Sequence, residues 1–160
     1  MIVFLNGEFL PAEQAFVSVL DRGFIFGDGI YEVIPAYNGK LLRLEQHLTR
    51  LKNNLDAIRL TDAVPDMQWE PVLKALLSRN GPGDMGVYLQ VTRGVAPRDH
   101  TLPDGVSATI FAMCNPIAPP APDLKNKGVA AITLEDSRWK NCHIKAISLL
   151  PNILLRQQAI

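Results

Sequence analysis

The sequence predicts an α+β protein: an N-terminal domain of antiparallel strands with two helices, then the beginning of a second, α/β domain. Three observations predict this organisation. Asn-Gly pairs at positions 6–7 and 38–39 stand between strand-like runs. Apolar residues at helical spacing begin at Leu44. A proline-rich stretch then separates these elements from the last part of the chain.

The first strands are predicted from the turns that join them. The segment "MIVFLNGEFLP" is typical of two strands around Asn6-Gly7, the strongest short-range signal for a hairpin. The segment "IYEVIPAY" is a further strand, closed by Asn38-Gly39. We therefore expect strand, turn and strand twice before the first helix.

Two helices follow these strands. The stretch "LEQHLTRLKNNLDAI" has leucine or isoleucine at spacings of four and three, which predicts an amphipathic helix with one apolar face. A second helix is predicted from Asp66 to Arg79, with an apolar face that includes Leu73 and Leu76. Asn80-Gly81 is a typical C-terminal end for it.

The remaining elements divide the chain into three parts. "MGVYLQVTRG" and "ATIFAMCNP" are predicted strands joined by the polar loop "VAPRDHTLPDGVS", which completes a domain over residues 1–116. We expect residues 117–127 to form an extended linker. Residues 128–160 begin a C-terminal domain with a strand at "VAAITLED" and a helix at "LLPNILLRQQAI". Because the chain ends inside an apolar helical pattern, we expect this domain to be incomplete.

The composition excludes several classes of partner. Sixteen basic residues balance sixteen acidic ones, so nucleic acid and membrane surfaces are not expected partners. No signal peptide or membrane span is predicted, which favours a cytoplasmic location. Cys114 and Cys142 match neither a disulfide framework nor a metal motif, so no metal site is expected.

Lys145 is the main candidate for a reactive group. It lies between apolar neighbours in "HIKAI", just before the predicted last helix. Apolar surroundings favour the neutral amine, which is the nucleophilic form of lysine and the form that makes Schiff bases. Most lysines are solvated at the surface, and this simpler interpretation of Lys145 stays open.

A possible anion site is the second candidate. In "TRGVAPRDH", Arg98 and His100 lie close together on a loop that Pro97 stiffens, and an arginine fork with a further donor suits a carboxylate. Arg50, which lies off the apolar face of the first helix, could bind a phosphate. Both features are also compatible with ordinary solvated side chains. Tyr31 follows the glycine-rich "FGDG" and could face the core or a pocket.

Taken together, these motifs resemble a known family. "RGFIFGDGIYEV", "RLEQHLTRL", "YLQVTRG", "PRDH" and "DSRWKNCHIKAISLLPNILLRQQA" are similar, in order and spacing, to segments of the fold type IV aminotransferases that use pyridoxal 5'-phosphate. The resemblance covers essentially the whole chain and is strongest to the bacterial D-amino acid aminotransferases. The motif around the lysine is the most specific.

The resemblance implies roles for three residues at the cofactor. Lys145 matches the family lysine that holds pyridoxal phosphate as a Schiff base and then acts as general base and acid. Arg50 matches the arginine that pairs with the cofactor phosphate. Trp139 matches a tryptophan near the cofactor. The family residues that contact the rest of the cofactor follow the lysine helix, so this chain is expected to carry only part of the active site.

The resemblance also implies a substrate site. Tyr31, Arg98 and His100 match residues that bind the substrate α-carboxylate in the D-amino acid enzymes, where the arginine and the histidine come from the other subunit of a homodimer. Tyr88 is expected to have a supporting role on the neighbouring strand.

The implied reaction is ping-pong transfer of an amino group between a D-amino acid and a 2-oxo acid. Within the family, 4-amino-4-deoxychorismate lyase and branched-chain aminotransferase are the alternatives. The "PRDH" loop favours the D-amino acid enzymes over both. A truncated, non-catalytic domain that serves binding or assembly is the alternative from another class.

Overall fold

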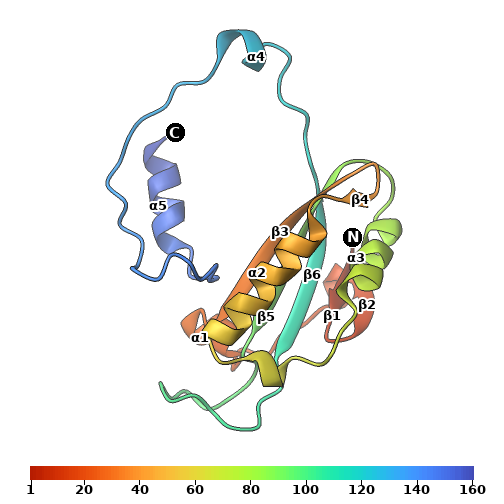
Figure 1. Cartoon of the computed structure of the whole chain (residues 1–160), viewed down its shortest axis with the longest axis vertical. Coiled ribbons are helices and arrows are strands. Elements are labelled where there is room, and N and C mark those ends of the chain that lie inside the picture. The colour runs from red at the N-terminus through yellow and green to blue at the C-terminus, as the bar shows by residue number, and fades with distance from the viewer.

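A single six-stranded sheet, antiparallel throughout, forms the body of the molecule (Figure 1). The computed structural model describes residues 1–124 and 126–160. The strand order across the sheet is β2-β1-β6-β5-β3-β4. The strands are β1 (Ile2–Leu5), β2 (Glu8–Pro11), β3 (Gly29–Tyr37), β4 (Lys40–Leu41), β5 (Met85–Thr92) and β6 (Thr109–Pro116).

Both predicted Asn-Gly hairpins are confirmed. Asn6 and Gly7 join β1 to β2 with φ angles of 49° and 100°, and Asn38 and Gly39 join β3 to β4 with φ angles of 49° and 73°. Two consecutive positive φ angles are those of a type I′ turn, which asparagine followed by glycine adopts at low cost. The turns therefore set the register of two strand pairs.

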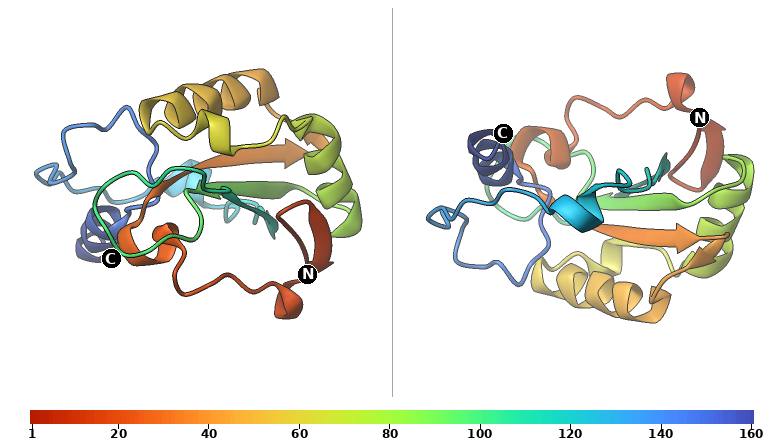
Figure 2. Two further views of the ribbon diagram at one scale, coloured as in Figure 1. Left: turned by 90° about the horizontal axis from the view of Figure 1, so that it is seen from below. Right: turned by 90° about the horizontal axis from the view of Figure 1, so that it is seen from above.

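Two long helices cover one face of the sheet, α2 (Leu44–Ala57) and α3 (Trp69–Arg79) (Figures 1 and 2). The predicted apolar faces are confirmed, since Leu51, Leu55, Leu73 and Leu76 are all buried against the sheet. Short helical turns occur at η1 (Ala12–Gln14), α1 (Arg22–Phe26) and η2 (Thr61–Ala63).

The helix predicted to begin at Asp66 begins instead at Trp69. Gln68, just before it, has an extended backbone with φ −78° and ψ 93°. This start puts Pro71 in the first turn, where no backbone N–H is needed. A start at Asp66 would have put the proline deeper in the helix, where it would remove a hydrogen bond and clash with the preceding turn.

The alternation along β3 separates the two faces of the sheet. Ile30, Ile34 and Ala36 are fully buried on the helical side, whereas Val33 and Tyr37 are exposed on the other side. Residues 12–21 pass along that second side (Figure 2). Tyr31 belongs to the same row as Val33, and the side chains of this row point away from the helices.

The C-terminal part leaves the sheet after β6 and returns to it at residues 145–147, just before the last helix. It contains α4 (Leu124–Lys127), so the linker that was expected to be extended over residues 117–127 ends in a helical turn. The last helix is α5 (Leu150–Gln158), and Pro151 stands in its first turn, as predicted. The strand predicted at residues 129–136 does not form, because no other described segment offers these residues a backbone ladder. None of the helices in the described ranges is long and apolar enough to span a membrane.

Candidate active site

The segment that carries Lys145 is bound to the free edge of β3. The backbone N–H of Tyr31 donates to the carbonyl of Lys145 at 3.0 Å, and the N–H of Ile147 donates to the carbonyl of Gly29 at 3.1 Å. A Cβ on Gly29 would lie 2.6 Å from the carbonyl oxygen of Val91 and 3.1 Å from Ile147. Glycine at this position therefore lets β3 pack closely between β5 and the lysine segment.

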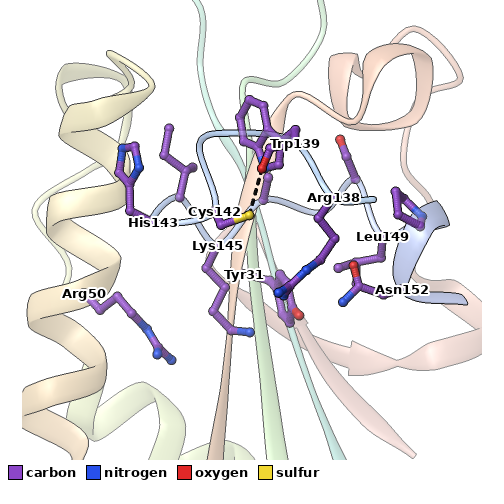
Figure 3. Close-up of a pocket in the computed structure, with 13 residues that line it drawn as sticks. Tyr31, Arg50, Arg138, Trp139, Cys142, His143, Lys145, Leu149 and Asn152 are labelled. Atoms are coloured by element: carbon purple, nitrogen blue, oxygen red, sulfur yellow. Dashed lines mark hydrogen bonds between the residues drawn. The ribbon is translucent and has the colours of Figure 1, made fainter. Parts of the chain in front are cut away.

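Lys145 shares one cavity with three of the other predicted residues. Tyr31, Arg50 and Trp139 line a cavity of about 520 Å³ together with Lys145 (Figure 3). Lys145 Nζ lies 3.8 Å from the centroid of the Tyr31 ring. At this distance the ring face attracts a protonated amine and holds the end of the lysine side chain over β3.

Arg50 enters the cavity from α2 and is held by a buried carboxylate. Its Nε donates to Glu32 Oε1 at 2.7 Å, and its Nη2 donates to Glu32 Oε2 at 2.6 Å. His47 Nδ1 lies 2.8 Å from the same Oε2. The hydrogen bonds to Glu32 raise the pKa of the Arg50 guanidinium, which is therefore a permanent cation.

Arg50 nevertheless keeps donors for a ligand. Its side chain is 49% exposed, while that of Glu32 is 0% exposed. Arg50 Nη1 makes no hydrogen bond to the part of the chain that the structure describes. A buried acid thus orients one edge of the guanidinium fork and leaves the other edge toward the cavity.

Tyr88 lies beside the cavity rather than in its lining. Its ring stacks on Tyr31 with the centroids 5.6 Å apart, and its hydroxyl donates to Gln90 Oε1 at 2.6 Å. Burial raises the pKa of the Tyr88 phenol above its usual value of 10, and the neighbouring Tyr31 adds to the shift. Tyr88 therefore contributes to the site by packing against the Tyr31 ring.

Arg98 and His100 do not line the cavity of their own chain. Both are exposed and lie near Phe26 of α1, with 5.3 Å between Arg98 Cζ and the ring centroid and 5.4 Å between the rings of His100 and Phe26. The structure therefore separates the predicted residues into two groups, one around Lys145 and the other around Phe26.

The sequence prediction missed Glu32 and His47. A signal for Glu32 was present, because alternation along β3 puts it on the same buried face as Ile30 and Ile34, and a buried carboxylate requires partners. Arg138, which is paired with Asp136 at 2.7 Å, also lines the cavity and was not predicted. Its sequence context, an exposed loop, contains no comparable signal.

The residues in the cavity suit an anionic ligand with a reactive carbonyl. A primary amine for covalent attachment, a fixed guanidinium for a phosphate and aromatic rings for a flat ligand are all present. The cavity volume is within the range of about 300–1,000 Å³ for small-molecule sites. Among the described residues, no group of three or more His, Cys, Asp or Glu side chains could hold a metal ion.

Comparisons with known proteins agree with this chemistry. The model of the family described as Amino-transferase class IV matches residues 29–160. D-alanine aminotransferase of Staphylococcus haemolyticus is 42% identical over 159 residues, covering 99% of this chain and 56% of that relative. The chain thus spans about half the length of the curated relatives it matches.

Solved structures show the same fold. A branched-chain aminotransferase from Thermoproteus uzoniensis, solved with norvaline, has a TM-score of 0.78 at 24% identity and covers 99% of this chain and 56% of its own. The PLP-bound form of a hypothetical aminotransferase from Mycobacterium tuberculosis has a TM-score of 0.75 at 22% identity, covering 99% and 60%.

Proposed function

The chain belongs to the class IV aminotransferase family, and from this premise we propose that it serves a pyridoxal-phosphate-dependent transfer of an amino group between a D-amino acid and a 2-oxo acid. One observation carries the proposal. The Lys145 amine, the Arg50 guanidinium and the Tyr31 ring meet in one cavity at the free edge of β3. The 42% identity to a D-alanine aminotransferase supports the D-amino acid class of substrate.

The residues present fit this cofactor. Lys145 would bind its aldehyde covalently, Arg50 would bind its phosphate, and Trp139 would contribute an apolar wall. Bound pyridoxal phosphate supplies an electron sink that stabilises negative charge at the substrate Cα. Arg50 is suited to a phosphate because its guanidinium is permanently charged and because Glu32 fixes its orientation before any ligand binds.

Lys145 is the proposed proton carrier. When its Nζ is a free amine, it can take the proton from the substrate Cα as general base. The backbone hydrogen bond from Tyr31 to the Lys145 carbonyl fixes the position of the lysine on β3. Tyr31 also covers one side of Nζ, which limits the directions from which the amine reaches the substrate.

Arg98 and His100 are the proposed ligands of the substrate α-carboxylate. A homodimer with shared active sites is part of the proposal, and it is supported by the position of these two residues outside the cavity of their own chain. In such a dimer the loop of one subunit completes the cavity of the other. A cytoplasmic location belongs to the same proposal.

The experiment uses protein expressed from its complete coding sequence and mixed with pyridoxal phosphate. We expect visible absorption, and after borohydride treatment peptide mapping should find the pyridoxyl group on Lys145. D-alanine should abolish the absorption and yield pyruvate. The matched control is Lys145→Ala, which should show no adduct while its unfolding free energy changes little, because the anchoring hydrogen bond uses the backbone.

The substrate specificity separates the alternatives. Conversion by L-leucine but not by D-alanine would identify a branched-chain aminotransferase and overturn the proposed substrate. Release of pyruvate from 4-amino-4-deoxychorismate without amino transfer would identify the lyase. No adduct on Lys145 in the protein from the complete coding sequence would leave a non-catalytic domain.

A further inference from the structure

A second carboxylate that is held by arginines, the partly buried Asp28, follows the C-terminal end of α1. Asp28 Oδ2 accepts from Arg22 Nε and from Arg93 Nε, both at 2.8 Å, and Asp28 Oδ1 accepts from Arg93 Nη2 at 3.1 Å. The arginine side chains are only 5% and 4% exposed. Two buried guanidinium groups beside one acid are tolerated only if their other N–H groups also have hydrogen-bond acceptors. The acceptors of these remaining N–H groups therefore show which parts of the chain the two arginines bind.

The two arginines use their remaining donors differently. Arg93 donates to the carbonyls of Ile58 at 2.7 Å and Arg59 at 3.2 Å, which ties the end of β5 to the residues after α2. Arg22 Nη1 instead donates to the carbonyl of Asp99 at 2.6 Å. Asp99 is the residue between Arg98 and His100, so Arg22 holds the backbone at the centre of the proposed carboxylate site.

The ring of Phe26 connects the same groups. Arg22 Cζ lies 4.8 Å from the ring centroid and Arg98 Cζ lies 5.3 Å from it, and the His100 ring is 5.4 Å away. Cations over an aromatic ring are attracted to its face. One aromatic side chain of α1 therefore packs against both proposed carboxylate ligands and against the arginine that holds their backbone.

The base of the loop is held by the same segment. The N–H of Arg22 donates to the carbonyl of Gly94 at 2.8 Å, and Asp21 pairs with Val95 in an antiparallel bridge. Gly94 has a φ of +80°, and a Cβ there would lie 2.0 Å from the carbonyl oxygen of Ser107. The loop is thus fixed at its base by backbone pairing and at its tip by the Arg22 side chain.

We propose that Arg22, with Phe26, is a positioning residue that sets the direction of Arg98 and His100 for the substrate carboxylate. This inference rests on the proposed function. Without the hydrogen bond from Arg22, the tip of the loop would keep its charged side chains, but the carbonyl of Asp99 would no longer be held in place. A carboxylate site that must order its own loop on binding has a lower affinity.

The test is Arg22→Lys in the cofactor-loaded protein from the complete coding sequence. A lysine ammonium is a single point charge and cannot make the Nε contact to Asp28 and the Nη1 contact to Asp99 in the same geometry. We expect KM for D-alanine and the inhibition constant of propionate, a carboxylate without an amine, to rise together by roughly 10- to 100-fold. The affinity for pyridoxal phosphate should stay unchanged, and kcat should change much less than KM.

Two arginine controls separate positioning from stability. Arg93→Lys disturbs the same Asp28 but not the loop tip, so it should lower the melting temperature with a smaller rise in KM. Arg79→Lys is the same substitution at another arginine that lies over an aromatic ring, with Arg79 Cζ 4.1 Å from the centroid of Phe9. Because this pair is distant from the loop, the variant should leave KM and the inhibition constant of propionate unchanged. If Arg22→Lys does not fold, Phe26→Leu keeps the ion pair and removes the ring, and the same rise is expected.

The outcomes distinguish the two proposals. An inactive wild-type protein would overturn the proposed function. Wild-type activity with equal constants for wild type and Arg22→Lys, or an equal rise for Arg22→Lys and Arg93→Lys, would overturn the positioning role of Arg22 alone.

Discussion

Two carboxylates in this chain, the buried Glu32 and the partly buried Asp28, have the same chemistry and different surroundings. Each accepts hydrogen bonds from two basic side chains. The Arg50 side chain on Glu32 is 49% exposed and lines the cavity, whereas both arginines on Asp28 are enclosed and bind backbone carbonyls. An acid–arginine pair therefore faces a cavity in one place and braces the structure in the other, according to where its remaining donors point.

The difference arises from the elements that supply the arginines. Arg50 comes from the exposed side of α2, so only its head group reaches Glu32. Arg22 lies at the start of α1 and Arg93 directly follows β5, and these two segments pack against each other. This comparison predicts that changes at Asp28 act on stability first and that changes at Glu32 act on cofactor binding first.

The largest effect on stability is expected for Asp28→Asn. Removing this charge leaves two enclosed guanidinium groups without a counter-charge, which costs about 3–5 kcal/mol when a buried pair is broken. Urea unfolding monitored by circular dichroism measures the loss. Asp123→Asn, in an exposed pair with Lys127, is the matched control and should change the unfolding free energy little. Equal losses in the two variants would contradict the enclosed character of the Asp28 cluster.

A smaller loss of stability, with a larger effect on the cofactor, is expected for Glu32→Gln. The amide keeps the shape of the acid, and Arg50 can turn to solvent, so we expect a loss of about 1–3 kcal/mol in the unfolding free energy. The affinity for pyridoxal phosphate, measured by absorbance titration, should fall about tenfold, equivalent to about 1.4 kcal/mol.

The control for this variant is Glu70→Gln, the same change in an exposed pair with Lys74. It should leave both quantities unchanged. Unaltered cofactor affinity in Glu32→Gln would show that Arg50 does not need its buried partner.

The smallest expected effect is on the acid dependence of stability. Burial alone would raise the pKa of the Asp28 carboxyl, but hydrogen bonds from Arg93 and Arg22 outweigh it and hold the pKa below 3.8. A folded-state pKa below the unfolded value means that the contribution is present above about pH 4 and is lost as the pH falls through the folded pKa. The unfolding free energy of the wild type should therefore fall more steeply below about pH 4 than that of Asp28→Asn.

Asp136→Asn is the reference for this pH experiment. Its exposed carboxyl also has a lowered pKa, of about 2, because of hydrogen bonds from Arg138. Solvent screens such a pair, so its removal should alter the acid limb less than Asp28→Asn does. The same slope for wild type and Asp28→Asn would mean that the two arginines do not lower the pKa of Asp28.

Local signals accounted for most of the secondary structure. Asn6-Gly7 and Asn38-Gly39 predicted their hairpins, because only their own backbone angles were needed. The leucine spacing predicted α2 for the same reason. The strand predicted at residues 129–136 failed because a strand requires a partner, and its own residues do not contain that information.

The candidate site divides in the same way. Residue types and motif resemblance identified Lys145, Arg50 and Tyr31 as candidates, and alternation along β3 would also have put Glu32 on the buried face. Two further features depend on contacts between residues far apart in the chain. These are the pairing of Glu32 with Arg50 and the hydrogen bond from Arg22 to the backbone between Arg98 and His100. Such contacts follow from the packing of the elements, so only the tertiary structure decided which charged pair faces a cavity and which one is enclosed.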